Sequence, residues 1–283
     1  MTGWTADQLP TMTGTRVVIT GATGGIGLIT ARELARVGAT VVLAARNVDK
    51  ARRAVAGMRG DFVVHRLDVA DLDSVRDFAQ SYTGNVDILI NNAGVMDIPA
   101  ARTAQGLDLQ TATNYFGPFL LTNLLLPRLT DRVVTVGSQL HRFGKLNLND
   151  LDWRTRKYNG LAVYESSKLA VVLFSLELQR RLTEAGNTVR SVVAHPGVAR
   201  TNLVSHSPLG VINRLPFLVQ DAERGALPLL YAATQNVPGN AYVGPDGLFS
   251  FTGYPMIRKP SRAAQNLTTA RTLWHATATL TGA

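Results

Sequence analysis

The chain has 283 residues, 46% hydrophobic and 17% charged, which is enough for one large α/β domain or two small ones and excludes global disorder. It contains no cysteine, which excludes disulfides, thiolate metal sites and a cysteine nucleophile, and its five histidines show no metal-ligand spacing. The net charge of +9 favours an anionic ligand, but no basic run interleaved with aromatic residues indicates nucleic-acid binding.

Residues 1–14 are predicted to be a surface lead-in. They lack a basic segment followed by an apolar one, and no stretch of the chain approaches 18 uninterrupted apolar residues. We therefore expect a cytoplasmic protein without a membrane partner. Residues 202–220 mix proline, glycine and large apolar side chains, which is typical of a lid over an apolar substrate or of an ordinary surface loop. A surface helix is expected in the tail at 260–283.

A glycine-rich turn follows the first expected strand, at 16–20, and precedes a helical pattern that ends at Val37. Strand, glycine-rich turn and helix together form the unit that cradles a pyrophosphate. Gly21 permits the tight turn, while Gly25 and Gly27 let the backbone and the helix, with its unpaired N–H groups, approach the phosphates. The residues of this turn predicted to bind a dinucleotide are Gly21, Thr23, Gly25, Ile26 and Gly27.

The end of the next strand, at 40–45, predicts which dinucleotide binds. An acidic residue roughly twenty positions after the glycines would bind the 2′-hydroxyl of NAD. Here Ala45 leaves that position neutral and Arg46 supplies a cation. We therefore predict NADP(H), with Arg46 on the 2′-phosphate.

Further strands alternate with helical patterns along the chain. This alternation predicts a single-domain, Rossmann-type doubly wound parallel sheet of roughly seven strands with helices on both faces. Ligands of such sheets bind beyond the carboxyl ends of the strands, so side chains at those ends can line one crevice. The remaining strands are expected at 62–67, 86–90, 132–136, 189–194 and 241–244, and helices at 71–82, 106–129 and 221–235, with a kink at Gly117-Pro118.

Tyr164 opens a further helix, because an apolar run extends from Leu169 to Leu178. Residues four apart share a helix face, so the Lys168 ammonium is expected one turn from the Tyr164 phenol. A neighbouring cation favours the phenolate, and lowering a phenol pKa from about 10 by about three units takes about 4 kcal/mol. Such a tyrosine could act as a general acid or base. Alone, the pair is more often a half-buried tyrosine and a solvated lysine on an ordinary helix, so the interpretation depends on the other motifs.

Several short motifs follow one another along the chain: Thr20-Gly21-x-x-x-Gly25-x-Gly27, Asp68-Val69, Asn91-Asn92-Ala93-Gly94, Asn114, Ser138, Tyr164-x-x-x-Lys168 and Pro196-Gly197. In this order they resemble the short-chain dehydrogenase/reductase family. The sequence Asn114-Tyr115-Phe116-Gly117 and the long interval from Ser138 to Tyr164 are similar to its retinol-dehydrogenase-like and protochlorophyllide-reductase-like branch. Because no membrane anchor or plastid address is recognised, the chain resembles a soluble bacterial member.

The resemblance implies a role for each residue. Tyr164 would exchange a proton with the substrate oxygen as hydride moves to or from the nicotinamide, while Lys168 would lower the Tyr164 pKa and hold the nicotinamide ribose. Ser138 would stabilise charge on the substrate oxygen. Asn114 would hold a water that links Lys168 to solvent, or else mark a helix kink. The other implied cofactor contacts are Asp68 and Val69 at the adenine, Asn91, Ala93, Gly94, Pro196 and Gly197 along the cofactor, and Thr201 at the carboxamide or pyrophosphate, where a loop turn is the alternative.

Two positions depart from the branch: Thr23 replaces a common Asn, and Gly137 precedes Ser138 where a second Ser is common. Neither belongs to the proton-transfer set, so activity is expected to survive. The leading hypothesis is an NADP(H)-dependent oxidoreductase acting on a small apolar alcohol, aldehyde or ketone. The alternatives are a carbon–carbon double-bond reductase and a non-catalytic NADP(H)-binding regulatory protein, and a homodimer or homotetramer is compatible with the apolar helix after Lys168. A serine hydrolase is disfavoured because the sequence after Gly137 is not a Gly-x-Ser-x-Gly elbow.

Overall fold

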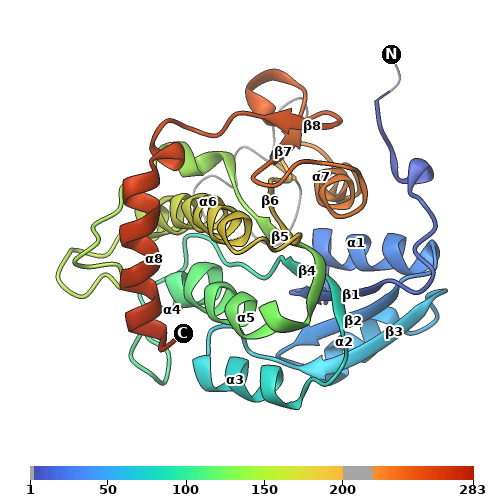
Figure 1. Cartoon of the computed structure of the whole chain (residues 1–283), viewed down its shortest axis with the longest axis horizontal. Helices are drawn as coiled ribbons and strands as arrows, with labels where there is room; N and C mark the ends of the chain where they lie inside the picture. The colour runs from blue at the N-terminus through green and yellow to red at the C-terminus, as the bar shows by residue number, and fades with distance from the viewer. Residues whose placement is uncertain (1–2, 200–218) are drawn as a thin grey trace.

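The computed structural model describes residues 3–199 and 219–283, in which one sheet forms the centre of the molecule (Figure 1). Within these residues the sheet has eight strands in the order β3-β2-β1-β4-β5-β6-β7-β8. Strands β1 to β7 pair in parallel, and β8 pairs antiparallel with β7. The strands are β1 Arg16–Thr20, β2 Thr40–Ala45, β3 Asp61–Arg66, β4 Val86–Asn91, β5 Leu129–Val136, β6 Arg190–Ala194, β7 Tyr242–Pro245 and β8 Pro255–Arg258.

The predicted doubly wound parallel sheet is confirmed, with one strand more than the roughly seven expected. The added strand, β8, pairs with β7 so that Ile257 lies opposite Val243. It escaped the sequence analysis because it is four residues long, begins with Pro255 and has a single β-branched residue. Short edge strands that carry proline give little periodic signal, because proline cannot donate to a ladder and is tolerated at an edge.

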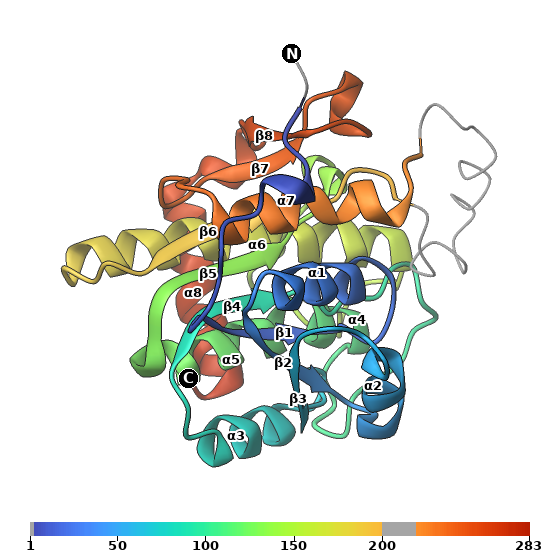
Figure 2. The ribbon, with the colours of Figure 1, turned by 90° about the vertical axis from the view of Figure 1, so that its right-hand side faces the viewer.

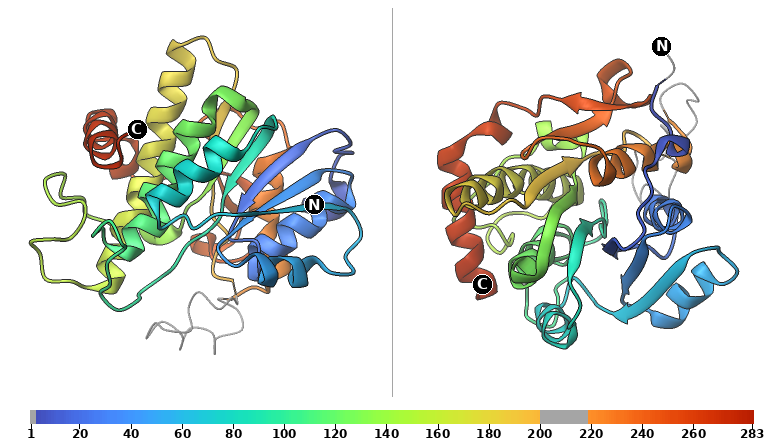
Figure 3. Two further views of the ribbon diagram at one scale, coloured as in Figure 1. Left: turned by 90° about the horizontal axis from the view of Figure 1, so that it is seen from below. Right: turned by 45° about the vertical axis from the view of Figure 1, so that its right-hand side comes forward.

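Helices cover both faces of the sheet, as predicted. Helices α1, α2 and α7 contribute to the hydrophobic cluster on one face, and α3, α5 and α6 contribute to the cluster on the other (Figure 2). Helix α8 lies outside α6 and packs against it (Figure 3). In the described ranges, no helix has the length and apolar character needed to cross a membrane. The helices are α1 Gly25–Arg36, α2 Val48–Val55, α3 Leu72–Ser81, α5 Gly117–Leu125, α6 Gly160–Glu184, α7 Ala222–Thr234 and α8 Leu267–Thr281.

The long helix expected at 106–129 is broken into several pieces. The short α4 (Leu109–Thr111) runs into a π-helical turn at Ala112–Phe116, and α5 follows directly. A Cβ on Gly117 would lie 1.7 Å from the Val69 carbonyl oxygen, so only glycine lets the helix pass this close to the chain after β3. Pro118, which has no N–H, adds to the disruption of the hydrogen-bond ladder. The irregularity therefore lies at the predicted kink, as a π turn.

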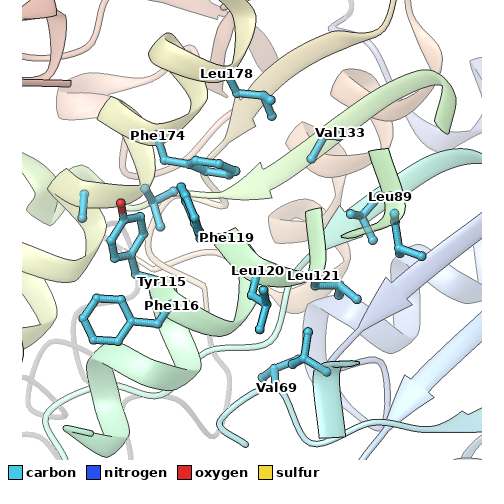
Figure 4. Packing of buried hydrophobic residues seen from close by; sticks show 14 of the residues in the cluster. Val69, Leu89, Tyr115, Phe116, Phe119, Leu120, Leu121, Val133, Phe174 and Leu178 are labelled. Atoms are coloured by element: carbon cyan, nitrogen blue, oxygen red, sulfur yellow. The ribbon is translucent and has the colours of Figure 1, made fainter. Parts of the chain in front are cut away.

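Aromatic and aliphatic side chains of the π turn and α5 fill the space between the sheet and α6 (Figure 4). Phe119 contacts Phe174 of α6 at a ring-centroid distance of 5.3 Å, and both rings contact Trp274 of α8. Full burial of each such side chain contributes about 1.5–3 kcal/mol. This packing fixes α6 and the π turn, and these two elements carry Tyr164 and Asn114.

Candidate active site

The turn between β1 and α1 has the backbone geometry that the glycines predict. Gly21 and Gly25 have φ angles of +69° and +54°, a region that favours glycine. A Cβ on Gly27 would lie 2.3 Å from the Asn92 amide nitrogen and 2.7 Å from the Gly21 carbonyl oxygen. Helix α1 begins at Gly25, so its first N–H groups open onto this turn. Thr23 is partly buried in the turn, and Ile26 packs towards Gly225 of α7.

Asn92 connects the end of β4 to this turn by hydrogen bonds, a role that the sequence did not predict. Its Nδ2 donates to the carbonyl oxygens of Thr20 (2.9 Å) and Gly21 (3.1 Å). In return, the Thr20 hydroxyl accepts from the backbone N–H groups of Asn92 (3.1 Å) and Ala93 (3.0 Å). The neighbouring Asn91, which was predicted near the cofactor, directs its buried amide to the Thr122 hydroxyl of α5 (2.9 Å). The two asparagines therefore act on opposite sides of the strand end.

Arg46 and Asp68 meet beyond the ends of β2 and β3. The Arg46 side chain is 77% exposed, and its Nη1 lies 3.9 Å from Asp68 Oδ2. Asp68 Oδ1 accepts from the Ala70 N–H (3.0 Å), which orients the carboxylate. Val69 is buried, and its carbonyl oxygen lies against Gly117. Two predicted cofactor residues therefore face one another at this edge, and the third contributes to the core beneath them.

Tyr164 and Lys168 share the buried face of α6, and each is 4% exposed. Lys168 Nζ lies 5.7 Å from the centre of the Tyr164 ring and donates to the Val136 carbonyl oxygen at 2.7 Å. A Cβ on Gly94 would lie 3.3 Å from Asn114 Oδ1 and 3.7 Å from Lys168 Nζ. Asn114 and Lys168 therefore both lie beside Gly94, just beyond the end of β4.

Asn114 is held in the π turn by its side-chain amide. Its Oδ1 accepts from the Val95 N–H (2.9 Å), and its Nδ2 donates to the Val95 carbonyl oxygen (2.9 Å) and the Ser167 hydroxyl (3.0 Å). Because Pro118 has no N–H, it cannot donate to the Asn114 carbonyl oxygen four residues earlier. The side chain of Asn114 thus holds the π turn against Val95 and Ser167, and the α-helical hydrogen bond to its backbone carbonyl oxygen is absent.

Ser138 lies beyond the carboxyl end of β5 and begins a 3₁₀ turn at Gln139–Arg142. Its hydroxyl accepts from the Leu140 N–H (3.2 Å). A Cβ on Gly137 would lie 2.7 Å from Val193 Cγ1. A side chain at position 137 would therefore have to displace a Val193 methyl group of β6, which agrees with a glycine at this position.

The pKa of Tyr164 differs from the expectation. Burial raises the pKa of Tyr164 to about 12, although the neighbouring Ser138 hydroxyl acts to lower it. Burial also lowers the pKa of Lys168 to about 8. The predicted net lowering of the phenol pKa is therefore wrong for this structure: desolvation disfavours both charged forms and outweighs the attraction of the Lys168 ammonium, which is directed at the Val136 carbonyl.

The turn after β6 approaches the same edge of the sheet. Gly197 has a φ angle of +69°, and a Cβ there would lie 2.3 Å from the Phe251 carbonyl oxygen. The Pro196 carbonyl oxygen accepts from the Gln220 side chain (2.7 Å). Thr201 and most of the segment 202–220 lie outside the described residues. Within the described residues, no group of three or more acidic or histidine side chains could hold a metal ion.

The doubly wound sheet and the glycine-rich turn together define a Rossmann-type dinucleotide-binding protein. Comparison with known proteins identifies its family. Residues 15–150 match the model of the short chain dehydrogenase family. The chain is 40% identical to human retinol dehydrogenase 13 over 100% of its length and 89% of that protein. It is also 40% identical to mouse polyprenol dehydrogenase, over 80% of this chain and 73% of the relative.

Among solved structures, an uncharacterized protein from Mycobacterium Paratuberculosis is 48% identical, with a TM-score of 0.89 over 99% of this chain and 98% of that one. The chain belongs to the short-chain dehydrogenase/reductase family, in its retinol-dehydrogenase-like branch. It is therefore an oxidoreductase of a family that binds a nicotinamide cofactor.

Proposed function

We propose that this protein is an NADP(H)-dependent oxidoreductase that transfers hydride between the nicotinamide and an apolar alcohol, aldehyde or ketone. The observation that carries the proposal is the meeting of Ser138, Tyr164 and Lys168 at the sheet edge that also holds the glycine-rich turn. The names of the relatives, retinol dehydrogenase and polyprenol dehydrogenase, refer to apolar alcohols and support this substrate class.

The chain fits a dinucleotide along this edge. At Gly21 and Gly27 the turn leaves no room for a Cβ, and it presents the first N–H groups of α1, as a pyrophosphate requires. Arg46 would bind the 2′-phosphate, because its guanidinium is exposed and lies 3.9 Å from the Asp68 carboxylate, which is too far for a hydrogen bond. Asp68 and Val69 would adjoin the adenine, and Lys168 would hold the nicotinamide ribose. The backbone of Asn91, Ala93 and Gly94, with Pro196, Gly197 and Thr201, would complete the cofactor site.

When bound, the nicotinamide supplies or accepts the hydride. In the reductive direction, the Tyr164 hydroxyl donates its proton to the substrate oxygen, and the Ser138 hydroxyl donates a hydrogen bond to the same oxygen. A pKa of about 12 keeps Tyr164 protonated at neutral pH, which suits a proton donor. The Lys168 ammonium then favours the phenolate that remains. A water on the Asn114 carbonyl would return the proton from solvent.

We also propose that one domain spans residues 1–283, since the sheet takes strands from Arg16 to Arg258. The test of function is NADPH and NADH oxidation by the purified chain with a panel of apolar aldehydes, ketones and enones. Carbonyl reduction with NADPH preference is expected, and Tyr164→Phe should lower kcat by at least about 10²-fold, as loss of general acid catalysis does. Turnover of enones alone would favour the double-bond reductase. Cofactor binding without any turnover would favour a regulatory protein and refute the proposal.

A further inference from the structure

A cluster of buried polar rings lies against Ser138, outside the residues assigned above. His141 and His195 are fully buried, and Tyr242 of β7 is 2% exposed. The Tyr242 ring stacks on His195 at a centroid distance of 5.2 Å and lies tilted against His141 at 5.3 Å. Its hydroxyl lies 3.2 Å from His141 Nδ1 and donates to the Ser138 carbonyl oxygen at 3.4 Å.

The hydrogen bonds of His141 define its tautomer. The Ser261 backbone N–H donates to Nε2 at 3.0 Å, so this nitrogen must be an acceptor without a proton. Nδ1 then carries the proton and donates it to the Ser138 carbonyl oxygen at 2.7 Å. Burial lowers the pKa of His141, in agreement with a neutral imidazole. Each ring nitrogen therefore has one backbone partner, and the two partners lie 123 residues apart in the sequence.

The Ser138 carbonyl oxygen is held from several directions. It accepts from the His141 side chain, from the His141 backbone N–H (3.1 Å) and from the Tyr242 hydroxyl. Because these bonds fix the peptide plane after Ser138, they also limit where the Ser138 hydroxyl can point. The other partner, Ser261, precedes α8, which packs on the helix that carries Tyr164.

We propose that His141 is a positioning residue for the reaction. Its imidazole connects the loop that carries Ser138 to the C-terminal segment at Ser261, and Tyr242 supports the same carbonyl group. This inference rests on the function proposed above, because it assumes that the Ser138 hydroxyl contacts the substrate oxygen. In this arrangement, disturbing His141 changes the rate of the chemical step and leaves the cofactor site intact.

Two substitutions separate the bonds of His141. His141→Asn places an amide nitrogen near the position of Nδ1, so it can keep the bond to Ser138 and lose the bond to Ser261. His141→Gln places an amide oxygen near the position of Nε2, so it can keep the bond to Ser261 and lose the bond to Ser138. We expect kcat for carbonyl reduction within about threefold of the wild type for His141→Asn and at least about tenfold lower for His141→Gln. The dissociation constant for NADPH should stay within about twofold in both variants.

A matched pair of tyrosines provides the control. Tyr82 is 3% exposed and donates to the Asn85 carbonyl oxygen at 3.4 Å, the same distance as the bond from Tyr242 to Ser138. Tyr242→Phe should lower kcat several-fold, and Tyr82→Phe should leave it unchanged, although each removes one buried hydroxyl.

Equal losses of kcat in His141→Asn and His141→Gln, or losses that follow the melting temperature across all four variants, would overturn the proposal and leave His141 a packing residue. If the wild-type protein binds NADPH but reduces no carbonyl in the same assay, the proposed function fails, and the positioning role fails with it. If the wild type reduces carbonyls and the substitutions of His141 and Tyr242 leave kcat unchanged, only the positioning role is refuted.

Discussion

Replacing Asn92 with alanine tests whether the conformation of the glycine-rich turn depends on hydrogen bonds from the end of β4 as well as on its own glycines. The substitution removes the donors to the carbonyl oxygens of Thr20 and Gly21, at 2.9 and 3.1 Å. It also removes the amide nitrogen that lies 2.3 Å from the position of a Cβ on Gly27. The turn would lose the contact that fixes its separation from the end of β4.

The size of the effect follows from the bonds lost. Each intramolecular hydrogen bond contributes about 0.5–1.5 kcal/mol net, so the two together are worth about 1–3 kcal/mol. If this free energy is needed to hold the turn in its binding geometry, the dissociation constant for NADPH rises by about 5- to 150-fold. Titration of the purified variant by the fluorescence of bound NADPH measures this directly.

Thr122→Val provides the control, because it removes the bond to Asn91, the adjacent asparagine, on the side of the strand that faces α5. This buried hydroxyl also donates to the Pro118 carbonyl oxygen at 2.7 Å, so the variant should unfold more easily. Its affinity for NADPH should change by less than about threefold. The assignment to Asn92 is refuted if Asn92→Ala binds NADPH like the wild type, or if Thr122→Val weakens binding as much.

Three further predictions concern single side chains. Arg46→Asp should shift the NADP/NAD preference by about 10- to 100-fold towards NAD, because a charge-assisted bond contributes about 1.5–3 kcal/mol; unchanged kcat/KM ratios would exclude Arg46 from the 2′-phosphate. Gly117→Ala should lower the free energy of unfolding in denaturant by at least about 1–3 kcal/mol, because its Cβ would lie 1.7 Å from the Val69 carbonyl oxygen; wild-type stability would contradict this packing. The kcat/KM for NADPH should fall above about pH 8 as Lys168 loses its proton, and this fall should be absent in Lys168→Met. The same fall in the wild type and in Lys168→Met would assign it to another group.

Local sequence patterns were sufficient for the glycine-rich turn and for the parallel pairing of the strands. They were sufficient because the cause is local: a positive φ at Gly21, or a β-branched run that ends in a polar residue, is encoded in a few neighbouring positions. The edge strand β8 and the π turn at Ala112–Phe116 depend instead on distant contacts. The close approach of Val69 to Gly117 is one such contact, and no spacing along the chain encodes it.

The two asparagines at the end of β4 illustrate the same limit at single-residue scale. Successive side chains of a strand point to opposite faces, so Asn91 and Asn92 could not both face the cofactor turn. The sequence does not identify which face the turn occupies. The side chain of Asn91, the predicted member, bonds to α5, so its backbone is the part proposed to adjoin the cofactor. His141 was likewise not predicted from the sequence as a functional residue, because its partners Ser138 and Ser261 come together only through the packing of the C-terminal segment.

The protonation of Tyr164 depends on the whole fold in the same way. Helical spacing predicts a nearby ammonium, but it does not predict that both groups are 4% exposed and that the ammonium bonds to Val136. With a pKa of about 12, the phenolate costs about 7 kcal/mol at pH 7, at about 1.36 kcal/mol per unit. Burial by the chain alone therefore favours Tyr164 as a proton donor, the form that carbonyl reduction uses. Alcohol oxidation needs the phenolate, and the positive charge of an oxidised nicotinamide in the crevice would add to that of Lys168 in stabilising it.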